Sequence, residues 1–347
     1  MSFLQEYPNF HRNLLRILLA AVLIFISIFL VFLRQTQAIS ISPVRIEMAV
    51  DPGRSEQGVF KVINDEAEGK LFYTSFENFE ATGETGNPNF IPGREGLASW
   101  ISAPSQIIVG PGETKEVPFT INVPRNADPG GYFAAIFLST SPPQSNRGGE
   151  VTIGARIGTL LLFRVNGDIK EGGALLEFGI KDNQKLFTSL PVPFYYRFQN
   201  AGDDRVRPVG NITIKNTLGM TSQVINANIS QGNVLPQSIR RFESSWLETS
   251  GKQQAVDAAV PESAGGKGFF AAAKAQAKNF ALGRYTAELG ITYGQANQQT
   301  ELAYVSFWVI PWQLLVLILV LLLIVYWILT RGLRKYNRWV IRRAGLK

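Results

Sequence analysis

Apolar and polar residues follow two different patterns along this chain. Between residues 39 and 306, short stretches alternate between apolar and polar positions, as residues 114–123 do most clearly. A period of two predicts β-strands that bury one face. Residues 17–33 and 307–329 are instead apolar at nearly every position, which is the pattern of helices long enough to cross a bilayer. The pattern therefore predicts a β-rich central part between two hydrophobic segments.

The alternating part divides into two units of similar length. In residues 39–168 we expect strands at 39–48, 59–63, 71–79, 99–102, 106–109, 114–123, 131–140 and 151–165. In residues 169–306 we expect strands at 175–180, 192–198, 211–215, 223–229, 239–246, 284–293 and 302–307. Many short strands separated by Gly, Pro, Asn and Asp are typical of antiparallel sandwiches. The predicted fold class is an all-β ectodomain of two tandem Ig-like β-sandwiches, with an N-terminal signal peptide or anchor and a C-terminal transmembrane helix.

Residues 248–279 do not fit the strand pattern. They are rich in Ala, Gly, Lys and Gln, and long loops inside a domain are often functional or disordered. The second half, FFAAAKAQAKNF, has a helix-forming composition but few residues to bury. We expect a flexible insertion in the second sandwich that contains one short helix.

Residues 307–329 predict a transmembrane helix. Tyr326 is the only ionisable residue in this stretch, and its length suffices for a hydrocarbon core of about 30 Å. Aromatic residues near both ends fit the belts found at membrane interfaces. The predicted interface anchors are Trp308, Trp312, Tyr326 and Trp327.

A basic tail, residues 330–347, follows and sets the expected topology. It holds seven cations and no acidic residue. The topology-setting side chains are Arg331, Arg334, Lys335, Arg338, Arg342 and Arg343. Since positive flanks stay in the cytoplasm, we expect the C-terminus inside the cell and the two sandwiches outside.

Residues 1–38 resemble a signal peptide. An apolar run precedes Thr36-Gln37-Ala38, where small residues fit a cleavage site after Ala38. An uncleaved signal-anchor is the alternative, and both export the rest of the chain.

The amino-acid composition excludes several classes of function. The tail accounts for the whole net charge of +7, so nothing predicts binding to nucleic acid. The chain has no cysteine and one histidine, His11, which excludes thiol chemistry and an extracellular His-based triad or zinc site. The acidic pairs Asp65-Glu66 and Asp203-Asp204 lack the spacing of calcium loops, and we interpret them as solvated turn charges. No cofactor, metal site or catalytic residue is predicted.

Three aromatic residues are the candidates for contact with a ligand. Trp100 lies beside a Gly-rich loop, while Tyr132 and Tyr195 each belong to a pair of adjacent aromatic residues. Neighbours in a strand face opposite ways, so one of each pair is expected at the surface. Stacking on sugar rings is the functional interpretation, and packing within the sandwich is the alternative.

Several phrases resemble known surface proteins. ISISPVRIEMAVDPGRSEQGVFKVIND and GPGETKEVPFTINVPRNADPGGYFAAIFL are similar to chaperone-like immunoglobulin domains. FQNAGDDRVRPVGNITIKNTLG, NVLPQSIRRFESSW and LGRYTAELGITYG resemble the second domain of WxL-interacting proteins, a family with two sandwiches, a membrane helix and a basic tail. The resemblance implies that the first domain contacts peptidoglycan and the second a surface protein, and it implies no catalytic residues.

The expected function is therefore non-enzymatic binding at the bacterial cell membrane. The partner would be cell-wall polymer, a surface protein or both, held through an edge strand or loop end. One alternative is an accessory subunit of a membrane complex that interacts through the helix and tail. A wall-modifying hydrolase is the second alternative, because the separation of paired carboxylates cannot be judged from sequence.

Overall fold

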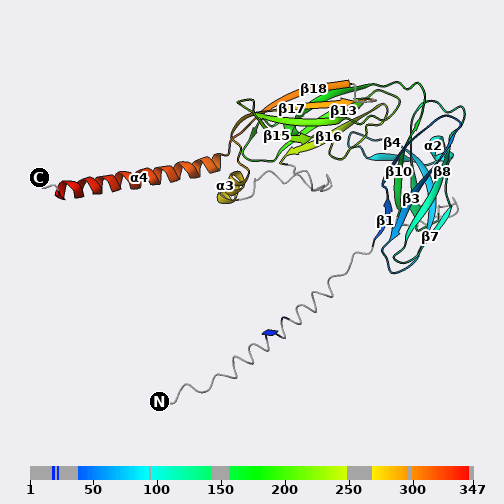
Figure 1. Ribbon diagram of the computed structural model, residues 1–347, viewed down its shortest axis with the longest axis horizontal. Helices are drawn as coiled ribbons and strands as arrows, with labels where there is room; N and C mark the ends of the chain where they lie inside the picture. Colours follow the sequence, from blue (N-terminus) through cyan, green and yellow to red (C-terminus); the bar gives the residue numbers. More distant parts are fainter. Residues whose placement is uncertain are drawn as a thin grey trace, which may run out of the picture.

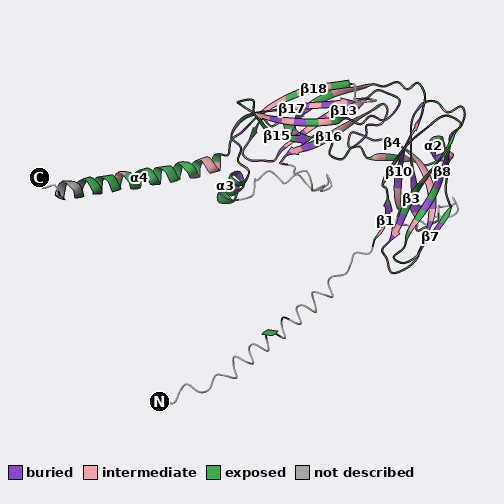
Figure 2. Cartoon of the chain, viewed as in Figure 1, coloured by how far each residue is buried: buried purple, intermediate pink, exposed green. Residues whose placement is uncertain are grey.

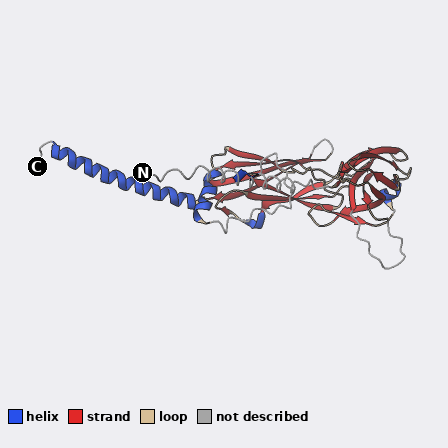
Figure 3. Cartoon of the chain, turned by 90° about the horizontal axis from the view of Figure 1, so that it is seen from below, coloured by secondary structure: helices blue, strands red, loops and turns tan. Residues whose placement is uncertain are grey.

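The described part of the chain folds into two β-sandwiches and one long C-terminal helix (Figure 1). The computed structural model describes residues 18–19, 22, 38–93, 95–142, 156–247, 268–294 and 299–343. The predicted signal peptide therefore lies largely outside the described residues, as does the first part of the predicted insertion. The sandwiches and α4 lie one after another, and α4 leaves the end of the second sandwich that is far from the first (Figure 3).

The N-terminal sandwich spans residues 39–165. One sheet has the order β1-β3-β8-β6, formed by β1 (Ile39–Ser42), β3 (Ser55–Asn64), β8 (Thr114–Asn122) and β6 (Ile101–Ser102). The other has the order β2-β10-β9-β4-β5, formed by β2 (Arg45–Val50), β10 (Arg156–Val165), β9 (Gly130–Ser139), β4 (Lys70–Ala81) and β5 (Pro88–Ile91), and β7 (Gln106–Val109) also pairs with β4. A short helix, α2 (Gly96–Trp100), connects β5 to β6.

The C-terminal sandwich spans residues 173–309. Its smaller sheet has the order β11-β13-β16, formed by β11 (Gly173–Ile180), β13 (Val192–Asn200) and β16 (Ser238–Trp246). Its larger sheet has the order β12-β18-β17-β14-β15, formed by β12 (Leu186–Phe187), β18 (Gln299–Val309), β17 (Gly283–Tyr293), β14 (Val209–Asn216) and β15 (Thr221–Asn226). A turn of 3-10 helix, η1 (Lys181–Asn183), separates β11 from β12.

Both sandwiches begin with a strand that changes sheets. In the first, β1 pairs with β3, the chain crosses at Pro43, and β2 then runs parallel to β10. In the second, β11 pairs with β13, and β12 then runs parallel to β18. Each crossing covers part of a sheet edge that would otherwise present unpaired backbone groups. All other strand pairs are antiparallel.

Each sandwich has its own hydrophobic core. Phe60, Phe72, Phe119, Ile136 and Phe163 are buried in the first. The second is richer in large rings, with Phe194, Tyr196, Phe198, Trp246 and Phe307 among its buried residues. Buried and more exposed positions alternate along β13 and β17 (Figure 2), so the predicted all-β, two-sandwich fold class is confirmed.

The long C-terminal helix begins later than the hydrophobic pattern predicts. Residues 307–309 belong to β18, and α4 (Trp312–Arg343) begins after them. Phe307 is 1 % exposed in the core of the second sandwich. The expected helical start at residue 307 is wrong, because a buried strand end and a membrane helix both consist of apolar residues and here only Ile310 and Pro311 separate them.

The helix expected within the predicted insertion is present, but it is better packed than its composition indicates. It is α3 (Phe269–Lys278), in which Ala272, Ala273 and Gln276 are buried. Gln276 contacts the start of α4. The short elements α2, β5 and β12 were not expected, because two to five residues carry no clear periodicity.

Candidate functional site

The structure brings two of the three predicted contact residues together. Trp100 at the end of α2 lies against Tyr132 of β9, with ring centroids 4.7 Å apart. Both are half-buried and packed on the core of the first sandwich, and the Tyr132 hydroxyl donates to the Asp128 carbonyl at 3.0 Å. This pair closes one side of the core and leaves only part of each ring accessible.

Tyr195 lies apart from them, on the outer side of the smaller sheet in the second sandwich. Its hydroxyl donates to Glu177, and the Arg241 guanidinium lies 4.1 Å above its ring. This hydrogen bond is the main cause of a raised pKa for the Tyr195 hydroxyl, and burial raises it further. A sugar-binding role for these three aromatic residues stays a prediction.

The predicted membrane anchors and cations lie along the C-terminal end of the chain. Trp308 is on β18 and Trp312 is the first residue of α4, whereas Tyr326 and Trp327 are exposed further along the helix. Arg331 stacks its guanidinium 3.9 Å from the Trp327 ring. The side chains of Arg338, Arg342 and Arg343 lie outside the described residues. Residues Trp312–Asn337 form a helix that is long and apolar enough to cross a membrane.

A second feature, which sequence analysis missed, is the junction between the sandwiches. The β4–β5 hairpin of the first sandwich reaches the smaller sheet of the second. There the Glu84 carboxylate accepts two hydrogen bonds from Arg197, the one from Nε at 2.8 Å. The backbone N–H of Arg241 donates to the Glu84 carbonyl at 2.8 Å. Paired contacts of this planar kind fix orientation as well as distance.

Glu47 on β2 forms the second part of the junction. It contacts Arg205 and Arg207 of the second sandwich, accepts from Asn233 Nδ2 at 3.2 Å, and also pairs with Arg45 of its own strand. Burial alone raises the pKa of the Glu47 carboxyl, but the arginines and Asn233 together outweigh it and hold that pKa below its usual value. Glu47 is therefore the ionised centre of this contact at neutral pH.

The third part is the turn after β13. The Asp203 carbonyl accepts from the Gly131 N–H at 2.8 Å, and Asp204 pairs with Arg164 at 3.4 Å. Burial raises the pKa of the Asp204 carboxyl despite its arginine neighbours. Interpreting this acidic pair as solvated is thus wrong for Asp204, which is 9 % exposed.

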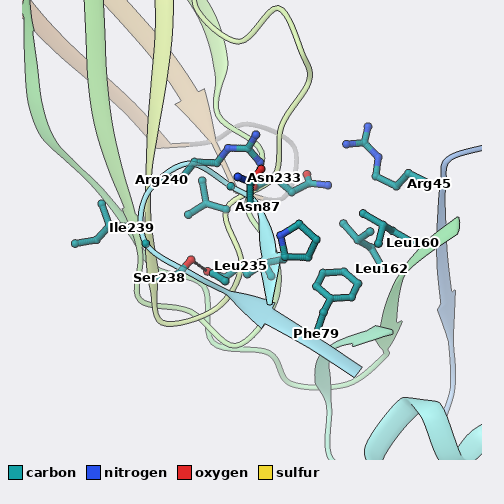
Figure 4. A pocket seen from close by; sticks show the side chains of 15 residues that line it. Arg45, Phe79, Asn87, Leu160, Leu162, Asn233, Leu235, Ser238, Ile239 and Arg240 are labelled. Atoms are coloured by element: carbon teal, nitrogen blue, oxygen red, sulfur yellow. Dashed lines mark hydrogen bonds between the residues drawn. The ribbon is translucent and has the colours of Figure 1, made fainter. Parts of the chain in front are cut away.

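A pocket lies between these contacts (Figure 4). Its apolar wall comes from both sandwiches and contains Phe79, Leu160, Leu162, Val234 and Leu235. Arg45 and Arg240 supply its cationic side chains. An apolar wall with a few convergent polar groups is the usual composition of a binding pocket.

Arg240 is held in an unusual way. Its guanidinium lies against two glycines, Gly86 and Gly232, and a Cβ atom added at Gly232 would meet Arg240 Cζ at 2.7 Å. Nη1 donates to the Asn233 carbonyl at 2.8 Å, but the buried Nε finds no acceptor among the residues that the structure describes. Burial lowers the pKa of Arg240, and the charge of Arg45 lowers it further. Gly86 covers the Nε atom, since a Cβ atom added at Gly86 would meet Arg240 Nε at 2.5 Å. Arg240 therefore places a partly buried positive charge in the wall of the pocket.

The charged groups of the junction pair with one another. Among the described residues, no group of three or more His, Cys, Asp or Glu side chains could hold a metal ion. The carboxylates of the junction are engaged by arginines, so they do not form a pair suited to proton transfer.

We expect the junction to loosen in acid. Since Glu47 and Glu84 have lowered pKa values, their contribution is complete above the ordinary value of 4.5 and is lost as pH falls through the lowered values. The pKa of the Asp204 carboxyl is raised, so its protonation in acid favours the folded junction and opposes this loss. Nitroxide labels at Val59→Cys and Leu218→Cys, both exposed, should report a broader interspin distance at about pH 3 than at about pH 7.

The matched control removes the two titrating groups. A protein carrying Glu47→Gln and Glu84→Gln should show the broad distribution already at neutral pH and change little on acidification. An unchanged distribution in the parent chain at both pH values would show that these carboxylates do not hold the junction.

Comparisons with known proteins give matches in structure but not in sequence. No protein-family model matches the chain, and no curated protein matches it by sequence. Solved structures similar to it include the class 5 fimbriae chaperone CfaA, with 14% identity over 62% of this chain and 96% of that chain and a TM-score of 0.34. The CupB2 chaperone of Pseudomonas aeruginosa has 10% identity over 77% of this chain and 100% of that chain, with a TM-score of 0.33. The E. coli chaperone DraB has 10% identity over 78% of this chain and 97% of that chain, with a TM-score of 0.32.

These comparisons do not point to the WxL-interacting family, so that part of the sequence resemblance stays a prediction. The fold itself follows from the strand order and the two cores described above. What this chain is similar to in the solved structures is a set of proteins built from β-sandwich domains.

Proposed function

We propose that the chain is a non-enzymatic, membrane-anchored surface protein that holds a protein partner at the junction between its sandwiches. The observation that carries this proposal is the partly buried positive charge of Arg240 in the wall of an apolar pocket between the sandwiches. A partner segment with an apolar side chain next to a carboxylate or carbonyl oxygen has the matching chemistry. The ionic contacts on both sides of the pocket keep its shape in the absence of a partner.

Membrane anchoring is part of the same proposal. Residues Trp312–Asn337 would cross the bilayer, and the cations from Arg331 onward would stay in the cytoplasm. The sandwiches would then face outward, and residues 1–38 would direct their export. The binding site would lie on the far side of the second sandwich from the membrane, where a partner at the cell surface can reach it.

A photo-crosslinking amino acid tests the site in intact cells. Placed at Leu235, which lines the pocket (Figure 4), it should yield a specific adduct, and the same amino acid at Leu218 on an exposed turn should not. Replacing Arg45 with alanine in the Leu235 protein should reduce the adduct, because one of the two cations facing the ligand is lost.

The nature of the adduct separates the partner classes. A discrete band removed by protease indicates a protein. A heterogeneous, high-mass adduct that disappears after digestion with a muramidase indicates cell-wall polymer, the other class that the resemblance implies. Equal labelling from both positions would contradict the junction as the binding site.

A further inference from the structure

Exposed aromatic residues gather where the second sandwich meets α4. Phe270 on α3 is 75% exposed and Phe280 just after it is 58% exposed. Trp308 on β18 and Trp312 at the start of α4 are each about half exposed. The ring of Phe269 packs on Trp312 with centroids 5.8 Å apart. An exposed apolar patch of this kind marks a contact with a partner or a membrane.

The helix α3 is attached to α4 through a buried glutamine. Gln276 is 2% exposed. Its Oε1 accepts from the backbone N–H of Leu314 at 3.0 Å, and its Nε2 donates to the Gln313 side chain. The first turn of any helix has N–H groups without partners inside the helix, and Pro311, which precedes α4, has no side-chain acceptor. Gln276 therefore caps α4 from a neighbouring helix and fixes α3 beside its first turns.

The length of the apolar helix determines the level at which α3 lies. From Trp312 to Thr330, just before the first cation, α4 rises about 28 Å at about 1.5 Å per residue. The hydrocarbon core of a bilayer is about 30 Å thick. Because these two lengths are nearly equal, Trp312 lies at the outer interface when Arg331 lies at the inner one. Since α3 contacts Trp312, Gln313 and Leu314 of α4, it is held at that interface as well.

We propose that α3, together with Trp308 and Trp312, forms a membrane foot that rests in the outer headgroup region of the bilayer. The occupant of the aromatic patch is a lipid surface, because the patch is continuous with the helix that would cross the membrane. This inference rests on the proposed membrane anchoring. Lys274 and Lys278 are exposed on the side of α3 away from α4, where they reach anionic headgroups. The foot would fix how the second sandwich stands on the membrane.

Site-directed nitroxide labels measure this directly, because the chain has no native cysteine. Four single variants, Phe270→Cys, Ala277→Cys, Leu321→Cys and Leu218→Cys, are labelled in the full chain. Each is reconstituted into vesicles of phosphatidylcholine and phosphatidylglycerol. Collision rates with oxygen, which enriches in lipid, and with a water-soluble nickel chelate then give a depth for each label.

We expect Leu321 to be the deepest, Phe270 and Ala277 to shift clearly towards lipid, and Leu218 to stay aqueous. Two positions on the same side of α3 guard against a local effect of replacing Phe270. If Leu321 is deep but both α3 labels behave like Leu218, the foot is overturned while the anchoring stands. If Leu321 is also aqueous, the membrane anchoring itself fails and the foot fails with it.

Discussion

Replacing Phe307 with alanine lowers the free energy of unfolding of the C-terminal sandwich by about 3–5 kcal/mol, the usual cost of removing a buried ring. Phe307 is 1% exposed. Its ring lies 5.6 Å from that of Phe194, with Phe187, Trp246 and Tyr285 also within about 6 Å. Its removal leaves a cavity in the middle of this aromatic cluster. Hydrogen exchange of β13 and β17 in the full chain in detergent measures the loss, since about 1.4 kcal/mol is tenfold in an equilibrium.

Trp308 is the matched control. It is the next residue on β18, but its side chain is about half exposed on the opposite side of the strand. Trp308→Ala should change the exchange of β13 and β17 by less than tenfold. If both variants leave these strands equally protected, Phe307 is not part of the core and the membrane segment begins earlier than the structure shows.

This pair of residues also shows what the sequence could predict at this point and what it could not. An apolar run of this length with a basic end predicts a membrane helix, and the structure contains a helix that is long and apolar enough to cross a membrane. The position at which the helix begins was not predictable from hydropathy. The inner face of β18 and the first turns of α4 are both apolar, and the helix start depends on pairing between β18 and β17, which is a long-range interaction.

The two-sandwich fold was predictable because most strands alternate and most turns contain Gly, Pro, Asn or Asp. Strands such as β8 and β17 lie where their pattern placed them. Where one strand was expected at residues 39–48, the chain forms β1 and β2 in different sheets, and Pro43 is the only local sign of this crossing. The partner of β2, β10, is more than a hundred residues away in the sequence, and no local pattern carries that information.

The candidate site was harder to predict for a related reason. The sequence pattern favoured aromatic residues, but the junction is built from arginines and glutamates, each of which resembles an ordinary surface charge. Glu84 and Arg197 are far apart in sequence, as are Glu47 and Arg205. The available signal was the density of charge in Asp203-Asp204-Arg205, which is unusual for a simple turn. Trp100 was expected beside a loop and Tyr132 within a strand, and the structure packs both rings on the core of the first sandwich.

The second large effect is expected from Asn200→Ala, because Asn200 connects the core of the second sandwich to the junction. Asn200 is fully buried. Its Nδ2 donates to the carbonyls of Asp204 and Val234 at 2.8 and 2.9 Å, and its Oδ1 accepts from the Gly202 N–H at 2.9 Å. Alanine removes all three hydrogen bonds, although the Val234 carbonyl still accepts from the Val206 N–H. Each buried group that loses its partner costs about 1–3 kcal/mol before water enters. We expect a total loss of about 3–5 kcal/mol.

The loss should spread to the first sandwich, which a simple packing defect would not do. The turn that Asn200 holds carries the Asp203 carbonyl and the Arg205 side chain, which contact Gly131 and Glu47. Hydrogen exchange should therefore increase at Gly131 of β9 as well as in residues 201–206. Asn211→Ala, at an exposed position of the same sandwich, should leave both regions unchanged.

Asn200→Asp distinguishes the effect of the lost hydrogen bonds from the effect of the lost side-chain volume. Aspartate is nearly isosteric and can still accept from Gly202, but it cannot donate to the two carbonyls and adds a buried charge. It should be at least as destabilising as alanine. If Asn200→Asp instead retains normal exchange at Gly131, the junction does not depend on these donated bonds. The contacts of Glu47 and Glu84 would then suffice to keep the two sandwiches, and the pocket between them, in place.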